Sequence, residues 1–164
     1  MDWKSLNKNY NALIKQLFHG KKWEDRAEAA RQLGFLQDGR AVNLLCRALK
    51  SEKDPSVSLR IIEALGRIGD GRATLRILEK LNHELENEYL DKRSLIFIIE
   101  SLMRIKDKRA LPYLSPFLDS EFEEIRTLTE KAFNSIEPRW KEILEGEKRQ
   151  KSIKEIFEAR LSRL

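Results

Sequence analysis

The sequence predicts an all-α protein, a right-handed solenoid of about four helix pairs closed by a C-terminal helical cap. The main observation is an internal repeat: the string Ile/Leu-x-Asp-x-Arg-Ala occurs three times, with its aspartates at positions 38, 70 and 107. Steps of 32 and 37 residues are typical of repeats made of one helix pair. A fourth copy, Ile-Glu-Pro-Arg at 136–139, has Pro138 in place of the aspartate. No segment shows the sustained two-residue alternation of a strand.

The helices follow from the spacing of apolar residues. The first is expected over residues 3–18, where Leu13 and Leu17 match apolar positions of later helices. Four further segments, 26–34, 58–66, 95–103 and 126–134, have apolar residues every three or four positions, the pattern of a helix with one buried face. We assign these four to an inner layer. The helices that open with the Arg-Ala of each string, and the first helix, form an outer layer.

The repeats are expected at residues 3–37, 38–69, 70–106 and 107–137, all within one domain. Residues 82–91 form a joint about five residues longer than its counterparts, which lengthens the adjoining helices or the turn between them. Each aspartate of the string is expected to cap the next helix. The arginine two residues later, Arg40, Arg72 or Arg109, is expected to pair with the aspartate of a neighbouring repeat.

The C-terminal segment, residues 138–164, departs from the repeat. Trp140, Ile143 and Leu144 are expected to continue an outer helix. Ser-Ile-Lys-Glu at 152–155 is a capping box that opens an amphipathic helix. The apolar residues of this helix are Ile153, Ile156, Phe157, Leu161 and Leu164. Two interpretations remain open: the helix covers the last repeat, or it docks on a partner or a second copy of the chain.

The repeated pattern resembles the HEAT-like repeats of the phycobilisome-lyase subgroup, which read roughly Val-Arg-x-x-Ala-Ala-x-Ala-Leu-Gly-x-Ile-Gly-Asp-x-Arg-Ala. Residues 25–41 and 57–73 are the most similar copies, and the resemblance extends over about residues 5–139. Ser58 and Leu95 replace the expected arginine. The resemblance implies an inner helix layer that lines a concave surface. It implies no particular activity, because most members bind other macromolecules and only a few lineages acquired chemistry.

Composition excludes several classes of protein. Charged residues make up 36% and hydrophobic residues 41%, with only 7 Gly and 4 Pro, so a folded domain is expected rather than a disordered or fibrous chain. No apolar run approaches the ~20 residues that span a bilayer. The N-terminus lacks the pattern of an export signal. One cysteine, Cys46, cannot form an intrachain disulfide, which fits a cytoplasmic protein.

Motifs of catalysis are missing from the sequence. It has no glycine-rich phosphate loop, no serine nucleophile elbow and no His-Glu-x-x-His. His83-Glu84 is similar to the His-Glu pairs of deoxyhypusine hydroxylase, but that enzyme needs several such pairs to hold two irons. We therefore expect no catalytic residues, no cofactor and no metal site, and a chain that is not an enzyme.

Function is expected on the outward face of the inner helices. The candidate partner-binding residues are Arg31, Arg60, Glu63, Arg67, Phe97, Glu100, Arg104 and Lys131. Glu63–Arg67 and Glu100–Arg104 have the spacing of helical ion pairs, and paired charges suit a protein partner better than a phosphate backbone. The first hypothesis is a non-enzymatic scaffold or adaptor that binds another protein, without contact to a membrane. It would be a monomer or a weak homodimer through the C-terminal helix.

Two other hypotheses remain. The chain would be a nucleic-acid-binding protein, or a base-repair enzyme like the HEAT-like DNA glycosylases, if its basic ends and groove contact phosphates. Residues 1–22 contain five lysines and one acid, and residues 138–164 contain eight basic residues and five acids. A third class is a lyase or hydroxylase subunit that holds a tetrapyrrole or iron.

Overall fold

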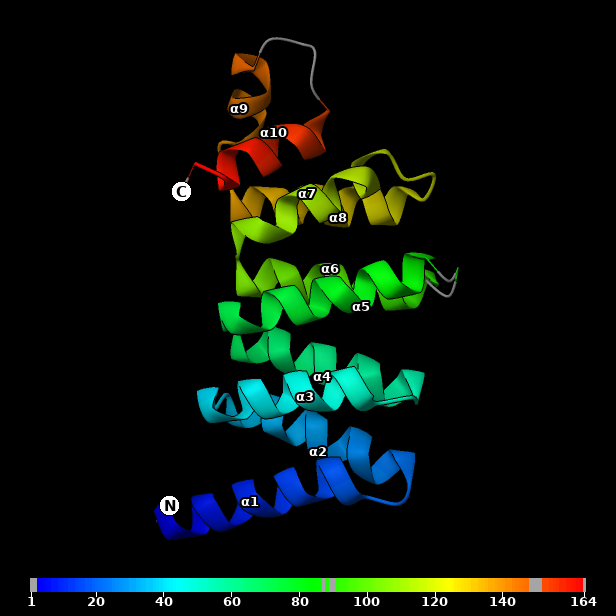
Figure 1. Ribbon diagram of the computed structural model, residues 1–164, viewed down its shortest axis with the longest axis vertical. Coiled ribbons are helices and arrows are strands. Elements are labelled where there is room, and N and C mark those ends of the chain that lie inside the picture. Colours follow the sequence, from blue (N-terminus) through cyan, green and yellow to red (C-terminus); the bar gives the residue numbers. More distant parts are fainter. Residues whose placement is uncertain (1–2, 87, 89–90, 148–151, 164) are drawn as a thin grey trace.

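The computed structural model describes residues 3–86, 88, 91–147 and 152–163, and within these ranges its regular structure is entirely helical (Figure 1). The α-helices are α1 (Trp3–His19), α2 (Trp23–Leu36), α3 (Val42–Ser51), α4 (Pro55–Ile68), α5 (Thr74–Glu86), α6 (Lys92–Ile105), α7 (Leu111–Leu114), α8 (Glu123–Ile136), α9 (Trp140–Gly146) and α10 (Ile153–Leu161). Short 3-10 helices are η1 (Gly39–Ala41), η2 (Gly71–Ala73), η3 (Lys108–Ala110) and η4 (Ser115–Asp119). The expected all-α solenoid is confirmed.

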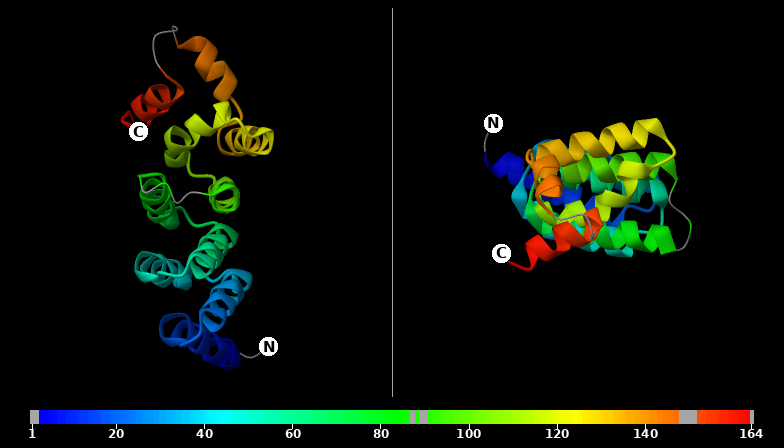
Figure 2. Two further views of the ribbon diagram at one scale, coloured as in Figure 1. Left: turned by 90° about the vertical axis from the view of Figure 1, so that its right-hand side faces the viewer. Right: turned by 90° about the horizontal axis from the view of Figure 1, so that it is seen from above.

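The helices stack in two layers along the molecule. In the left view of Figure 2, α2, α4, α6 and α8 form one column, and α1, α3, α5 and α7 form the other. The even-numbered helices pack closely against one another, whereas successive odd-numbered helices have few mutual contacts. The inner layer is therefore the tighter one, and the stack curves toward it.

Two glycines explain the close packing of the inner helices. A Cβ atom on Gly34 would lie 2.8 Å from the Cα of Ala64, and one on Gly66 would lie 2.7 Å from the Cα of Ser101. Only glycine lets the two backbones approach this far. The third inner helix has Met103 at the same repeat position, and its side chain is partly buried against the core.

A single apolar core runs between the layers. The alanines that open the outer helices, Ala41, Ala73 and Ala110, are fully buried, as the repeat predicts. The largest fully buried side chains include Leu33, Leu45, Ile61, Ile77, Ile98 and Phe133. No helix within the described ranges combines the length and the apolar character needed to cross a lipid bilayer.

The joints at positions 38, 70 and 107 share one geometry. In each, the aspartate carboxylate accepts a 2.9 Å hydrogen bond from the backbone N–H two residues later, as expected for a helix cap. The arginine binds the aspartate of its own repeat, so the expected pairing with a neighbour's aspartate is wrong. The contact with the preceding repeat goes to a backbone carbonyl in two joints, from Arg72 to Gly39 at 3.0 Å and from Arg109 to Gly71 at 2.9 Å. In the first joint, Arg40 donates to the side chain of Asn7 at 3.0 Å. We call this arrangement the Asp–Arg clasp.

The longer joint at residues 82–91 is accommodated in part by helix. Helix α5 continues to Glu86 and is three residues longer than α3. Residues 87, 89 and 90 of this joint lie outside the described residues.

The C-terminal segment leaves the stack and then returns to it. Helix α9 points away from the two columns, and it is α10 that packs on α7 (Figure 2). The expectation that Trp140, Ile143 and Leu144 continue the outer layer is therefore wrong. The capping box of Ser152 and Glu155 is confirmed. Ile156 and Phe157 are buried in the chain itself, which supports the capping interpretation of this helix; Leu164 lies outside the described residues.

Candidate functional site

The expected partner-binding residues lie on the four inner helices, and the structure places six of the eight in two groups. Arg31, Arg60, Glu63 and Arg67 lie together on α2 and α4. Glu100 and Lys131 lie together on α6 and α8. Phe97 and Arg104 belong to α6, at positions three residues before and four residues after Glu100.

The first group surrounds an exposed aromatic ring. Phe35 at the end of α2 is 58% exposed. The guanidinium carbon of Arg67 lies 4.0 Å from the ring centroid, and that of Arg31 lies 5.2 Å from it. Both distances are within the range of cation–π attraction. The ring is thus held in place by two arginines from neighbouring repeats while much of it faces solvent.

Two glutamates bind the arginines of this group. Glu63 accepts from Arg60 at 2.8 Å and from Arg67 at 2.7 Å, which confirms the expected Glu63–Arg67 pair. Glu28 accepts from both Nε and Nη2 of Arg31 at 2.7 Å. We call the six residues Glu28, Arg31, Phe35, Arg60, Glu63 and Arg67 the Phe35 cluster.

The arginines shift the titration of these glutamates. Hydrogen bonds from Arg31 and then Gln32 lower the pKa of Glu28 to about 2. Burial raises the pKa of Glu63, but the hydrogen bonds from Arg60 and Arg67 outweigh burial and leave that pKa below its ordinary value. Both carboxylates are therefore ionised at neutral pH, and the cluster carries three positive and two negative charges.

Phe35 and Glu28 are the members that were missing from the expected set. Their signal is present in the sequence, because Phe35 stands at the repeat position of Arg67, and Glu28 at that of Arg60. What the sequence does not show is the distance between α2 and α4, which decides whether Arg67 reaches the ring.

The second group lines a hollow between α6 and α8. Its walls are Ile96, Glu100, Glu123, Glu124, Thr127, Leu128 and Lys131. Glu124 forms an ion pair with Lys92 at 2.5 Å. Three acids against Lys131 make this part of the inner surface acidic, in contrast to the Phe35 cluster.

Phe97 and Arg104 belong to neither group. Phe97 is half-buried, with the guanidinium of Arg93 6.0 Å from its ring centroid. The expected Glu100–Arg104 ion pair does not form within the described part of the chain, and Arg104 is exposed. The structure therefore brings four of the eight expected residues into one connected cluster.

Residues outside the inner surface offer little for chemistry. Burial raises the pKa of the Cys46 thiol, although Arg76 and Arg72 oppose this shift, so the thiol stays protonated and unreactive at neutral pH. Among the described residues, no group of three or more His, Cys, Asp or Glu side chains is placed to hold a metal ion.

Comparison with known proteins places these repeats in context. The family described as HEAT repeats matches residues 10–94, about half of the chain. The bilin biosynthesis protein PecE of Mastigocladus laminosus is 33% identical over 101 residues, which are 62% of this chain and 35% of that protein. PecE of Nostoc sp. strain PCC 7120 is 32% identical over 101 residues, 62% of this chain and 38% of that protein. The chain thus spans little more than a third of the length of these relatives.

The relatives confirm one expectation and correct another. The resemblance to HEAT-like repeats of the phycobilisome-lyase subgroup is confirmed. The expectation that the chain is not an enzyme is contradicted, because both relatives are named for bilin biosynthesis. That expectation rested on missing motifs, and a motif search detects only catalytic residues that are close together in sequence.

Proposed function

Because this chain belongs to the HEAT-repeat family, we propose that it binds a protein partner through its inner-helix surface, with the Phe35 cluster at the centre of the contact, and that the complex acts in bilin chemistry. The observation that carries the proposal is the exposed Phe35 ring held between Arg31 and Arg67. Aromatic and arginine side chains are enriched in protein interfaces, where a few residues carry most of the binding energy. A ring that is already ordered loses little conformational entropy on binding.

The remaining expected residues extend this contact along the inner surface. Phe97 and Arg104 would meet the partner beyond the Phe35 cluster, and Glu100 and Lys131 would meet it at the hollow between α6 and α8. A partner that matches this surface presents acidic groups to α2 and α4 and basic groups to the hollow. Such complementarity of charge fixes the orientation of the complex.

The role in bilin chemistry is supported by the two relatives. A bilin is an open-chain tetrapyrrole with flat apolar faces and carboxylate side chains. The exposed Phe35 ring suits the flat faces, since aromatic rings stack on one another, and the net positive charge of the Phe35 cluster suits the carboxylates. The proposal places the complex in the cytoplasm, where the lone thiol of Cys46 stays reduced.

Nucleic-acid binding gains no support from the inner surface. Arg31, Arg60 and Arg67 are each bound to a glutamate at 2.7–2.8 Å, whereas phosphate contacts call for free cations. The alternative therefore depends on the basic residues near the chain ends. Anisotropy titration with a DNA duplex at low salt tests it, and a salt-sensitive affinity that survives Arg67→Glu would replace the proposed function.

Site-specific photocrosslinking tests the protein contact. The photoreactive amino acid p-benzoylphenylalanine replaces Phe35 in one variant and Leu75 in the control. Leu75 is a good match, because it is 53% exposed on the outer helix α5. In extract of the source cells, we expect a light-dependent adduct from position 35 that Arg67→Glu reduces at least tenfold. Equal adducts from both positions, or an adduct insensitive to Arg67→Glu, would contradict the proposal.

The bilin part is tested separately with biliverdin as the probe. Once the crosslinked partner is identified, the purified complex is titrated with biliverdin and followed by its absorbance spectrum. A saturable spectral change that requires both proteins supports the proposal. If the complex forms and the spectrum of biliverdin stays unchanged, the protein contact stands and the bilin role is wrong.

A further inference from the structure

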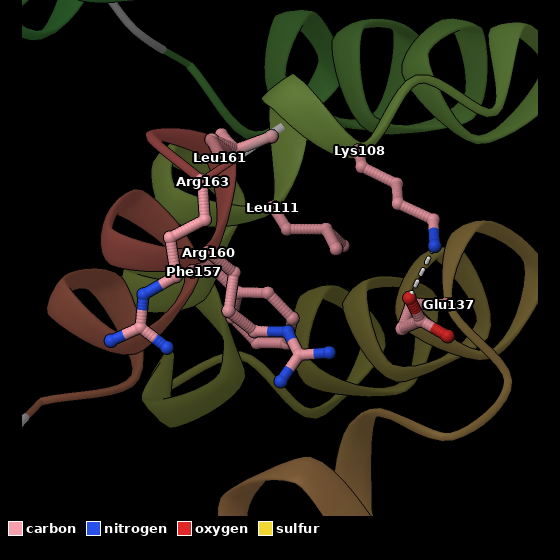
Figure 3. A pocket seen from close by; sticks show the side chains of 7 residues that line it. All are labelled: Lys108, Leu111, Glu137, Phe157, Arg160, Leu161 and Arg163. Atoms are coloured by element: carbon pink, nitrogen blue, oxygen red, sulfur yellow. Dashed lines mark hydrogen bonds and ion pairs between the residues drawn. The ribbon is translucent and has the colours of Figure 1, made fainter.

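A separate cavity lies at the C-terminal end of the molecule, between α10, α7 and the end of α8 (Figure 3). Its apolar wall consists of Leu111, Phe157 and Leu161. Leu111 is fully buried and Phe157 is 4% exposed, so this wall is fixed by the packing of the core. The cavity has a volume of about 250 Å³. An apolar wall of this kind favours an apolar group over water.

Cations dominate the polar part of the cavity. Lys108, Arg160 and Arg163 line it, with Glu137 as the one carboxylate among its lining residues. The Lys108 ammonium lies 2.6 Å from Glu137, so these two charges neutralise each other. Arg160 and Arg163 form no ion pair with any side chain that the structure describes. In Figure 3 the Arg160 guanidinium lies beside Phe157, and the Arg163 guanidinium points to the other side, away from Leu111.

From this arrangement we infer that the cavity binds a small organic carboxylate with an apolar body. The body would contact Leu161 and the accessible edge of Phe157, and the carboxylate would pair with Arg160, while the charge of Arg163 adds to the attraction. Guanidinium groups bind carboxylates through short, charge-assisted hydrogen bonds. Ligand pockets for drug-sized molecules begin at about 300 Å³, so this cavity suits a single ring or short chain rather than a whole tetrapyrrole.

The inference is independent of the proposed function, because the cavity is lined by α7, α8 and α10 and not by the Phe35 cluster. The ligand class has two possible sources. One is a free aryl or alkyl acid, and the other is the carboxylate arm of a larger molecule such as a bilin. Both present the same chemistry to the two arginines.

Titration of the full chain with 3-phenylpropionate, followed by NMR, tests the inference. We expect saturable shifts of the methyl signals of Leu111 and Leu161. The amide 3-phenylpropionamide has the same shape without the charge, and we expect it to bind at least tenfold more weakly. The double variant Arg160→Gln/Arg163→Gln should lower the affinity for the acid to that of the amide. Lys154→Gln is the matched control, because it removes a cation from α10 that does not line the cavity.

Equal affinities for acid and amide, shifts that do not saturate, or full affinity in the double variant would each overturn the inference, provided that the variants keep their melting temperature. Competition with biliverdin then identifies the source. Displacement of 3-phenylpropionate by biliverdin indicates the carboxylate arm of a bilin, and failure to displace it indicates a free acid; both results support a carboxylate site.

Discussion

The first three joints of the solenoid and the fourth are built differently, although they occupy the same repeat position. At residues 38, 70 and 107 an aspartate caps the next helix and holds an arginine two residues on. At the fourth joint Pro138 replaces the aspartate, and α9 begins without a side-chain cap. After the first three joints the next outer helix stays in the stack, and after the fourth the chain turns away (Figure 1).

At the C-terminal end of the stack, apolar packing takes the place of the Asp–Arg clasp. Phe133 of α8 meets Trp140 with ring centroids 5.1 Å apart and Phe157 with centroids 5.7 Å apart, both edge to face. The Trp140 indole N–H donates to Asn134 at 2.7 Å. The clasp therefore sets the direction of the chain in the middle of the solenoid, while aromatic burial closes its end.

The inner helices also differ between the first part of the solenoid and its end. Gly34 and Gly66 allow the first three inner helices to touch through their backbones, whereas Met103 and Asn134 occupy the same position in the last two. The Phe35 cluster lies on α2 and α4, which pack closely at Gly34. Close packing of α2 and α4 is what brings Arg67 to the Phe35 ring.

The largest loss of unfolding free energy is expected from removing the aromatic contacts that close the end of the solenoid. Phe157→Ala deletes a buried ring that contacts Phe133, and such changes cost about 3–5 kcal/mol of unfolding free energy. Urea denaturation followed by circular dichroism measures the loss. Phe122→Ala is the control, since its ring is 50% exposed, and it should cost less than about 1 kcal/mol. Similar losses in both variants would show that α10 does not close the solenoid.

A smaller loss of unfolding free energy is expected from adding a methyl group between two inner helices. Gly66→Ala places a Cβ 2.7 Å from the backbone of Ser101 and should cost about 1–3 kcal/mol, even though alanine favours helix. In Gly146→Ala the added methyl meets nothing within 4 Å, so stability should hold or rise slightly. Urea denaturation of both variants compares them. Unchanged stability in Gly66→Ala would mean that the inner helices separate without cost.

The sequence predicts the helices and the joints because both depend on local patterns. The 3.6-residue periodicity defines the inner helices, and Asp-x-Arg-Ala marks each clasp within a few residues. The contacts that it did not predict depend on distances between elements. The arginines were assigned to the wrong aspartates, because the repeat does not show that Arg72 reaches the carbonyl of Gly39. Likewise, nothing local in residues 140–144 indicates that α10 takes the place on α7.

Prediction of the candidate site is limited in the same way, because it also depends on distances between helices. Periodicity assigned Arg31, Arg60, Glu63 and Arg67 to one face of α2 and α4, and the structure brings them together. The other four expected residues lie on α6 and α8, near the three acids of the hollow, and Arg104 forms no ion pair with Glu100 in the described part of the chain. Charge at a helical position is visible in sequence, whereas the partner of each charge depends on the packing of the next repeat.

The smallest loss of unfolding free energy concerns the clasp itself, and its size depends on pH. The hydrogen bonds from the Arg72 side chain and then its backbone N–H hold the pKa of Asp70 below its ordinary value of 3.8. Since the pKa is lower in the folded state, this aspartate stabilises the fold above about pH 4, and the contribution fades as pH falls through the folded pKa. Asp70→Ala should therefore cost about 1 kcal/mol at pH 7 and less at pH 2. Urea denaturation of the two proteins across this range measures the difference.

The variant Asp70→Asn distinguishes the contribution of the helix cap from that of the ion pair with Arg72. Asparagine still caps a helix, so it should retain most of the stability at pH 7 and lose the pH dependence. The ion-pair part is small, because Arg72 is about half exposed and solvent screens the charges. If the cost of Asp70→Ala stayed constant down to pH 2, folding would not lower the pKa of Asp70, and a neutral carboxyl group would cap the helix as well as the carboxylate does. The middle joints would then differ from the fourth only in having a cap, and the arginine would serve solely to bridge to the carbonyl of the preceding repeat.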